Sequence, residues 1–221
     1  MCGRYCVDEE SMEELLRIIR NLDQHLQGER IQTSDPNNED THVPRKFRTG
    51  EIYPTNVVPI IAKRGEDIIS CAMTWGYKGF QGNAVIMNAR SESASDKKMF
   101  AGDLEVRRIV VPASGFYEWE HNGSKTKYYF TSEQQKPLYM AGISHPYEEE
   151  DRFVILTTAA NESMKDIHNR MPVLLREEEI EGWLSSKENA ISIMKRIPEQ
   201  LKKTKASPKK EPEFEQLKFL W

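Results

Sequence analysis

The sequence predicts an α+β fold in which antiparallel β-sheets form a partial, barrel-like core flanked by helices. Between residues 57 and 158, short runs rich in β-branched and aromatic residues follow one another and are separated by turn residues. Helical spacing is found before, within and after this region. The chain has 221 residues, 38% hydrophobic and 30% charged, which suits one core under a well-solvated surface. We therefore expect one domain over residues 1–197 and a flexible, lysine-rich tail over residues 198–221.

The first helix is expected over residues 11–22. Ser11 and Glu14 have the spacing of a capping box, in which each side chain caps a backbone N–H of the first turn. Apolar residues then recur at helical spacing, at Met12, Leu15, Leu16, Ile19 and Leu22. Residues 23–50 are polar and broken by prolines, which predicts a long loop, and a basic cluster near its end comprises Arg45, Lys46 and Arg48.

The strands begin after a turn at residues 53–56. Val57–Ala62 and Ile68–Trp75 flank the turn residues 64–66, which predicts a hairpin. Glycines at 76, 79 and 82 indicate a flexible connection to a short strand at residues 85–87, and a helix is expected to follow through residue 100. Five further runs have strand composition: residues 107–111, 116–121, 127–131, 138–143 and 153–158. Turn residues at 112–115 separate the first two of these runs, and Asn122-Gly123 predicts a hairpin between the second and third. Helices near residues 177–185 and 188–196 close the domain.

Composition also predicts where in the cell the protein is found. No apolar run approaches the roughly 20 residues that a membrane helix needs, and no signal-peptide pattern opens the chain. We expect a cytoplasmic, monomeric protein whose cysteines (Cys2, Cys6 and Cys71) form no disulfide. The net charge of −4 argues against a uniformly basic surface but is compatible with a local basic groove.

The start of the chain has two reactive groups close together if Met1 is removed. Cys2 follows Met1 directly, and its small side chain favours removal of that methionine by an aminopeptidase. An exposed Cys2 has an amine and a thiol on adjacent carbons, so the amine can condense with an aldehyde and the thiol can then close a thiazolidine ring. Ordinary pKa values of about 8 for the α-amine and about 8.5 for the thiol leave both groups partly deprotonated near neutral pH. Many chains carry cysteine at position 2 by chance, so a functional role for Cys2 depends on what the rest of the sequence contains.

Four polar residues stand at the ends or junctions of apolar segments: Asn88, Arg90, Glu118 and His168. Strand alternation puts Glu118 on one face with Phe116 and Glu120, opposite Tyr117 and Trp119. Burial among apolar neighbours would raise the pKa of Glu118 and let it move protons; a solvent-facing glutamate on an edge strand is the alternative. His168 is an acid–base candidate, or a structural histidine in a loop.

Nucleic-acid contacts have candidates of their own. Arg4, Arg90, Arg170 and the basic cluster at residues 45–48 could contact phosphates, and Trp75, Tyr117 and Trp119 could stack on bases. Each also has an ordinary interpretation as a surface arginine or a core aromatic residue. A zinc site made from the cysteines and His168 is disfavoured, because the Cys2–Cys6 spacing has no second paired motif.

Taken together, these residues resemble a known family. The successive motifs of the SOS response-associated peptidase (SRAP) family are similar to Met1–Tyr5, Tyr53–Asn56, Trp75-Gly76, Asn88–Glu92, Val111–Trp119 and His168–Pro172. The resemblance covers roughly residues 1–197 in the family's order. The chain departs from the pattern after Gly76, where Tyr77–Phe80 replace an apolar stretch that ends in proline, so the shape of one DNA-facing loop is open.

The resemblance implies a fold, an activity and a set of residues. It implies a bacterial-type protein that senses abasic sites in single-stranded DNA and crosslinks to them through Cys2 as a thiazolidine, with no cofactor or metal. The matching positions around Cys2 are Asn88, Glu118 and His168. The expected DNA contacts are Arg4, Pro54, Asn56, Trp75, Arg90 and Arg170.

Two other activities remain open from the residues alone. A thiol peptidase would use Cys2 as nucleophile, His168 as base and Asn88 or Glu118 as the orienting group, and could remove its own Met1. A non-covalent module for single-stranded DNA would use the arginines and aromatic residues only. A free amine at Cys2 is required by the crosslinking chemistry but not by cleavage of an internal peptide bond.

Overall fold

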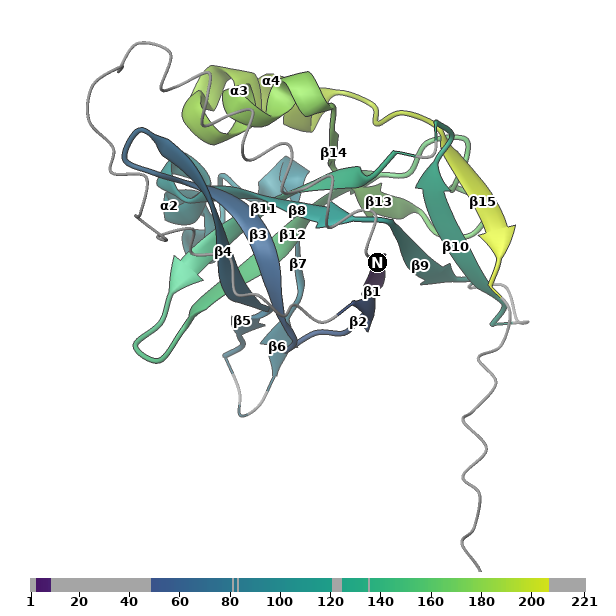
Figure 1. Cartoon of the computed structure of the whole chain (residues 1–221), viewed down its shortest axis with the longest axis horizontal. Helices are drawn as coiled ribbons and strands as arrows, with labels where there is room; N and C mark the ends of the chain where they lie inside the picture. The colour runs from purple at the N-terminus through teal and green to yellow at the C-terminus, as the bar shows by residue number, and fades with distance from the viewer. Residues whose placement is uncertain are drawn as a thin grey trace, which may run out of the picture.

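The computed structural model describes residues 3–8, 49–80, 82, 84–120, 125–134 and 136–206. Within these ranges the chain forms three β-sheets with helices packed on one side, which confirms the predicted α+β class (Figure 1). No helix of the described ranges is long and apolar enough to cross a membrane. The predicted helix over residues 11–22, nearly all of the loop that follows it and the basic cluster at residues 45–48 lie outside the described residues.

An eight-stranded sheet forms the main body of the fold. Its members are β3 (Val57–Arg64), β4 (Asp67–Trp75), β7 (Asn88–Arg90), β8 (Arg108–Ala113), β11 (Leu138–Pro146), β12 (Asp151–Ala159), β13 (Arg170–Pro172) and β14 (Leu174–Leu175). The strands β4, β3, β8 and β11 follow one another, and β12 pairs with both β4 and β11. This pairing closes a ring, so the predicted partial barrel is present. The predicted β3–β4 hairpin is confirmed, with Ile60 opposite Cys71.

A second, five-stranded sheet carries the start of the described chain. Its order is β15 (Leu201–Lys205), β10 (Lys127–Ser132), β9 (Gly115–Trp119), β1 (Arg4–Val7) and β2 (Gly50–Ile52). All of its neighbouring strands are antiparallel. The expected pairing of β9 with β10 is therefore confirmed.

The remaining elements are short. β5 (Tyr77–Lys78) pairs with β6 (Val85–Ile86), so the motif departure after Gly76 is a small hairpin. Gly76 is required there, because its φ is +110° and an added Cβ would lie 2.2 Å from a Val85 methyl carbon. The helical elements are η1 (Ser91–Ser93), α2 (Lys98–Val106), η2 (Glu177–Glu179), α3 (Ile180–Ser185) and α4 (Lys187–Lys195).

Two apolar cores hold these layers together. The first joins the two large sheets, with Tyr5 and Phe116 from the five-stranded sheet packed among Trp75 and Ile155. The second joins the eight-stranded sheet to the helices and includes Trp183 of α3. Burying one such side chain stabilises the fold by roughly 1.5–3 kcal/mol. The first core therefore fixes β1 and β9 against β12.

Three predictions about elements need correction. The helix expected up to residue 100 is a turn of 3₁₀-helix at η1, followed by α2, which begins at Lys98. The turn expected at residues 112–115 is absent from this described stretch: β8 and β9 are separated by Ser114 alone, and the chain passes from one sheet into the other. Residues 201–205, expected in a flexible tail, form β15 and pair with β10. Residues 207–221 of that expected tail lie outside the described residues.

Candidate functional site

Strand β1 brings the start of the chain beside β9. Arg4 pairs with Tyr117, and Tyr5 pairs with Phe116. Cys2 lies outside the described residues and precedes Arg4 by two positions. Tyr5 is fully buried and contacts Trp75, with 5.1 Å between ring centroids. The first core thus fixes the strand that leads to Cys2.

Glu118 is buried on the inner face of β9. Its exposed fraction is 4%, its neighbour on that face is the fully buried Phe116, and Tyr117 and Trp119 are only half-buried. The backbone N–H of Trp119 donates to Oε1 of Glu118 at 3.4 Å. The predicted division of β9 into two faces is confirmed, and the alternative of a solvent-facing glutamate is wrong.

Asn88 and Arg90 lie on β7, which pairs in parallel with β12. Asn88 is opposite Ile155 and Arg90 is opposite Thr157. Paired residues share a face of the sheet, so Asn88 lies on the side where Ile155 enters the first core. Arg90 is exposed and forms no ion pair with any residue that the structure describes. Its guanidinium is therefore available to a ligand.

His168 lies at the end of the loop between β12 and β13. It is 8% exposed, and its backbone N–H donates to the carbonyl of Met164 at 3.0 Å. The backbone N–H of Arg170 donates to Nδ1 of His168 at 2.9 Å. Because that nitrogen is the acceptor, the neutral imidazole carries its proton on Nε2. The ring is thus oriented to donate a proton from Nε2.

Arg170 is already engaged by protein groups. Its two terminal nitrogens donate to the carboxylate of Glu92 at 2.7 and 2.8 Å, and one of them also donates to the carbonyl of Thr157 at 2.5 Å. The guanidinium holds the pKa of Glu92 below its usual range. A phosphate that contacts Arg170 has to compete with Glu92. The sequence motif that contains Glu92 predicts no role for this residue.

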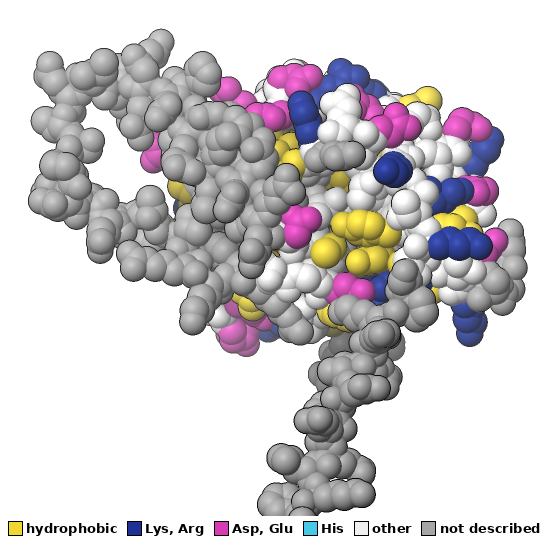
Figure 2. Space-filling view, turned by 45° about the vertical axis from the view of Figure 1, so that its right-hand side comes forward, with side chains coloured by type: hydrophobic (Ala, Val, Ile, Leu, Met, Phe, Trp, Pro, Cys, Tyr) yellow, Lys and Arg dark blue, Asp and Glu magenta, His cyan; other side chains and the backbone are white. Residues whose placement is uncertain are grey.

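The outer face of the five-stranded sheet carries a second group of charges and rings. Arg4 lies over the rings of Tyr53 and Trp119, at 4.2 and 5.0 Å, and donates to Glu51 at 3.4 Å. Glu51 also accepts from Lys127 at 2.7 Å. On the side of the molecule that carries β10 and β15, lysine and arginine side chains border a hydrophobic patch (Figure 2). Glu51 and Lys127 were not predicted, because only the pairing of β2, β1, β9 and β10 brings them together.

Two of the predicted DNA contacts, Trp75 and Asn56, make structural contacts within the protein. Trp75 is fully buried, donates from Nε1 to the carbonyl of Met87 at 3.0 Å and stacks on Phe153. It offers no free face to a base, which corrects the prediction of a stacking surface. Asn56 closes the turn that contains Pro54, accepting from the Tyr53 N–H through Oδ1 at 3.1 Å. Pro54 itself is half-buried in that turn.

The two described cysteines are weak nucleophile candidates. Burial raises the pKa of the Cys6 thiol, and burial raises the pKa of Cys71 to about 11. The thiolate is the reactive form, so both are largely protonated near neutral pH. They lie in different sheets, on β1 and β4. Within the described residues, no group of three or more His, Cys, Asp or Glu side chains is arranged to hold a metal ion.

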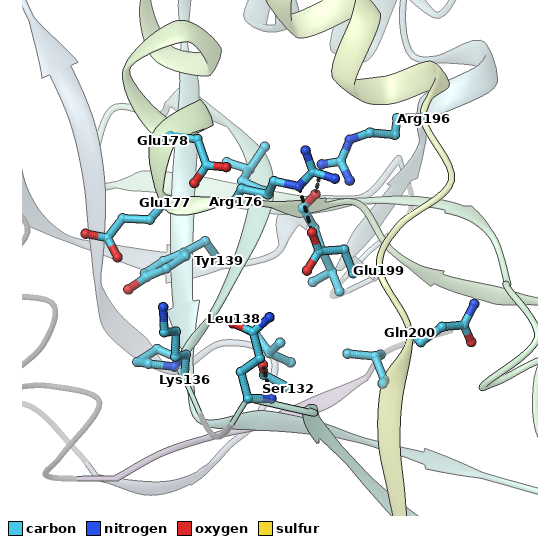
Figure 3. A pocket seen from close by; sticks show the side chains of 15 residues that line it. Ser132, Lys136, Leu138, Tyr139, Arg176, Glu177, Glu178, Arg196, Glu199 and Gln200 are labelled. Atoms are coloured by element: carbon cyan, nitrogen blue, oxygen red, sulfur yellow. Dashed lines mark hydrogen bonds and ion pairs between the residues drawn. The ribbon is translucent and has the colours of Figure 1, made fainter.

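A hollow of about 250 Å³ lies elsewhere, between β10, β14 and the segment that leads into β15 (Figure 3). Both arginines of its lining are paired: Arg176 donates to Glu199 at 2.6 Å, and Arg196 donates to Glu179 at 2.6 Å. Its described lining includes none of the predicted site residues.

Known proteins with similar sequences and folds complete the description. The profile of the SOS response associated peptidase (SRAP) family matches residues 1–210. The chain is 28% identical over 190 residues to abasic site processing protein YedK of Escherichia coli, covering 83% of this chain and 79% of that protein. It is 35% identical over 109 residues to abasic site processing protein YoaM of Bacillus subtilis, covering 46% of this chain and 48% of that protein.

A crystal structure of a protein from Bordetella bronchiseptica has the same fold, with a TM-score of 0.68 and 18% identity over 94% of this chain and 100% of that one. A crystal structure from Bacteroides thetaiotaomicron has a TM-score of 0.67 at 21% identity and covers 93% of this chain and 92% of that one. The family match extends over most of the sequence, including every motif that carries the candidate site. The chain therefore belongs to the SOS response associated peptidase (SRAP) family.

Proposed function

We propose that this protein processes abasic sites in single-stranded DNA by forming a thiazolidine crosslink between Cys2 and the ring-opened sugar, after loss of Met1. The observation that carries the proposal is the pairing of β1 with β9. Arg4 pairs with Tyr117, the residue before the buried Glu118, so the chain start is tied to a strand that carries a buried carboxylate. Relatives named abasic site processing proteins support the same substrate.

The chemistry requires an amine, a thiol and a proton donor. The Cys2 amine adds to the aldehyde carbon and gives a carbinolamine. A proton from Glu118 or His168 lets the hydroxyl leave as water, which produces an iminium ion. The thiol adds to the iminium carbon through sulfur and releases its proton to the group that supplied the first one. The ring closes with the net loss of one water.

The described residues can supply the supporting roles. His168 carries its neutral-form proton on Nε2, so this nitrogen can donate to the leaving hydroxyl or to the sugar oxygen. Asn88 lies on the face of β7 that meets the first core and can orient the amine by a hydrogen bond. Arg90 is exposed and can contact a phosphate of the strand. Holding both reactants in place can lower the barrier by several kcal/mol, up to about 7–11.

The direct test uses protein whose loss of Met1 has been verified by mass spectrometry. It is incubated with a single-stranded oligonucleotide containing one abasic site, and with the same strand undamaged, then heated and run on a denaturing gel. We expect a shifted band with the abasic strand only, with a mass equal to the two partners minus one water. Absence of that band would overturn the proposal. Cleavage of peptides without DNA would favour the thiol peptidase, and shifted bands only on native gels would favour a non-covalent binder.

A further inference from the structure

The ion pair between Glu92 and Arg170 joins three elements next to the candidate site. Glu92 belongs to η1, directly after β7, and Arg170 opens β13. Two nearly parallel hydrogen bonds, at 2.7 and 2.8 Å, connect the carboxylate to the guanidinium. The same guanidinium donates to the carbonyl of Thr157 on β12 at 2.5 Å. Bidentate pairs of this kind fix orientation as well as distance.

The backbone of Arg170 contacts Nδ1 of the His168 ring and so affects which ring nitrogen carries the proton. The Arg170 N–H donates to Nδ1 of His168 at 2.9 Å, and the carbonyl of Arg170 lies 3.2 Å from the same atom. The N–H and the carbonyl belong to the two peptide planes on either side of the Arg170 Cα. A small change in the backbone dihedrals of Arg170 would therefore bring the carbonyl closer than the N–H and favour a proton on Nδ1 instead of Nε2. Whatever fixes Arg170 therefore also fixes the tautomer of His168.

We propose that Glu92 is a positioning residue that acts on His168 through Arg170. By clamping the guanidinium against Thr157, Glu92 adds to the pairing of Arg170 with Ala159 and holds the Arg170 backbone in the conformation that keeps the His168 proton on Nε2. The inference rests on the proposed function for the use of that proton. Its geometric part, the tautomer, stands independently of any reaction.

The same contact also offsets the charge of Arg170. The Arg170 side chain is 14% exposed and that of Glu92 is 50% exposed, so the pair lies at the surface and is accessible to a ligand. Without Glu92 the Arg170 guanidinium loses its ion-pair partner. Removal of Glu92 should therefore slow the chemistry while leaving strand binding as tight or tighter. General loss of structure would weaken both, so the split identifies a positioning role.

The experiment compares Glu92→Gln with Glu105→Gln in the full chain. Glu105 is a matched control: its side chain is also 50% exposed, and it pairs with Lys187 at 2.6 Å. Three quantities are measured in each protein. They are the ¹⁵N ring resonances of His168 by NMR, the crosslinking rate on a saturating abasic strand, and the Kd for an undamaged strand.

We expect Glu92→Gln to show a mixture of His168 tautomers, a rate about tenfold lower and a Kd that is unchanged or lower, whereas Glu105→Gln matches the wild type. In an Arg170→Gln background, Glu92→Gln should have little further effect on the tautomer, because the bidentate contact of Glu92 with the Arg170 guanidinium is already lost. Glu92→Asp, which keeps the charge, should recover part of the rate. A wild-type His168 spectrum in Glu92→Gln would overturn the proposal. If even the wild type fails to crosslink, the proposed function fails, while the tautomer still decides this inference.

Discussion

The side chains of Arg4 and Glu118 point to opposite faces of one five-stranded sheet. Arg4 pairs with Tyr117 and shares its face, and Glu118 is the next residue along β9. Glu118 is buried beside the first core, whereas Arg4 lies over Tyr53 and Trp119 on the outer side. The proposed proton transfer at Glu118 and the proposed DNA contact at Arg4 therefore lie on different sides of β9. Their substitutions should have separable effects.

The first prediction concerns the buried acid. Glu118→Gln keeps the shape of the side chain but removes its exchangeable proton, so crosslinking should slow by about 10²–10⁴ if Glu118 is the proton donor, while undamaged strands bind as before. The measurement is a single-turnover gel assay beside a binding titration. Glu120→Gln, on the same face of the chain two residues later, is the matched control. Wild-type kinetics in Glu118→Gln, in His168→Ala and in the double variant would refute the assignment of both residues.

The second prediction concerns the exposed arginine. Arg90→Ala should weaken binding of a single strand and reduce the slope of log K against log salt by about 0.7, the value for one lost phosphate contact on single strands. Arg90 is suited to this test because it has no ion pair within the described residues. Arg64→Ala, 65% exposed at the far end of the β3–β4 hairpin, is the control. An unchanged salt slope in Arg90→Ala would remove Arg90 from the DNA-binding surface.

Local patterns predicted those parts of the fold that local physics determines. The β3–β4 hairpin follows from two apolar runs around Gly65, and the faces of β9 follow from the alternation of Phe116 and Glu118 with their neighbours. Helices α3 and α4 follow from helical spacing, with Ser186 capping α4 through a bond from the Asn189 N–H at 3.2 Å. In each case the residues of a short segment are enough to determine its local structure.

Long-range pairing accounts for what was missed. Glu51, Lys127 and Arg4 lie far apart in sequence and meet only because β2, β1, β9 and β10 are neighbours. The lysines of β15 predict a solvated tail, but this segment pairs with β10, with Lys203 opposite Phe130. Trp75 was predicted to stack on bases, but its side chain is fully buried in the first core. The role of an aromatic residue or a cation depends on contacts that no local pattern contains.

The third prediction tests the corrected role of Trp75. Trp75→Ala should lower the free energy of unfolding by about 3–5 kcal/mol, because it empties a fully buried site and loses the bond to Met87. Phe80→Ala is the control: the Phe80 side chain is 86% exposed, so its loss should change stability by less than about 0.5 kcal/mol. Urea denaturation measures both. A marginal stability change in Trp75→Ala, with weakened DNA binding, would restore the stacking role.

The fourth prediction concerns pH. Arg170 holds the pKa of Glu92 below its usual range in the folded protein. A lowered folded-state pKa stabilises the fold above the ordinary value, about 4.3, and this contribution is lost as the pH falls through the folded pKa. The stability difference between wild type and Glu92→Gln should therefore be present near neutral pH and vanish in acid. It should be modest, because Glu92 is half exposed and screened by solvent. In an Arg170→Gln background the pH dependence should shrink, because Arg170 makes the largest contribution to the lowered pKa and backbone hydrogen bonds make smaller ones. An undiminished pH dependence there would contradict the assigned cause.

The final prediction separates the amine of Cys2 from its thiol. In Cys2→Ser the amine remains but the neighbouring nucleophile is far weaker. An imine should still form on an abasic strand and be trapped by borohydride, while the unreduced, heat-stable adduct should largely disappear. Gels run with and without borohydride measure the two species. A heat-stable adduct at wild-type levels in Cys2→Ser would show that sulfur takes no part in the product.

The matching arm blocks the amine and keeps the thiol. A short tag placed before Cys2 turns the amine into an amide, whose nitrogen cannot form an iminium ion, so both the reducible and the stable adducts should be lost. A peptidase that uses only the thiol on an internal bond has no need of a free amine and should keep its activity. Protein from which the tag is afterwards removed, restoring Cys2 as the first residue, is the control and should regain both adducts. If the tagged protein crosslinks as well as the untagged protein, the thiazolidine mechanism is wrong, because the step that commits the aldehyde to the protein would not need the nitrogen.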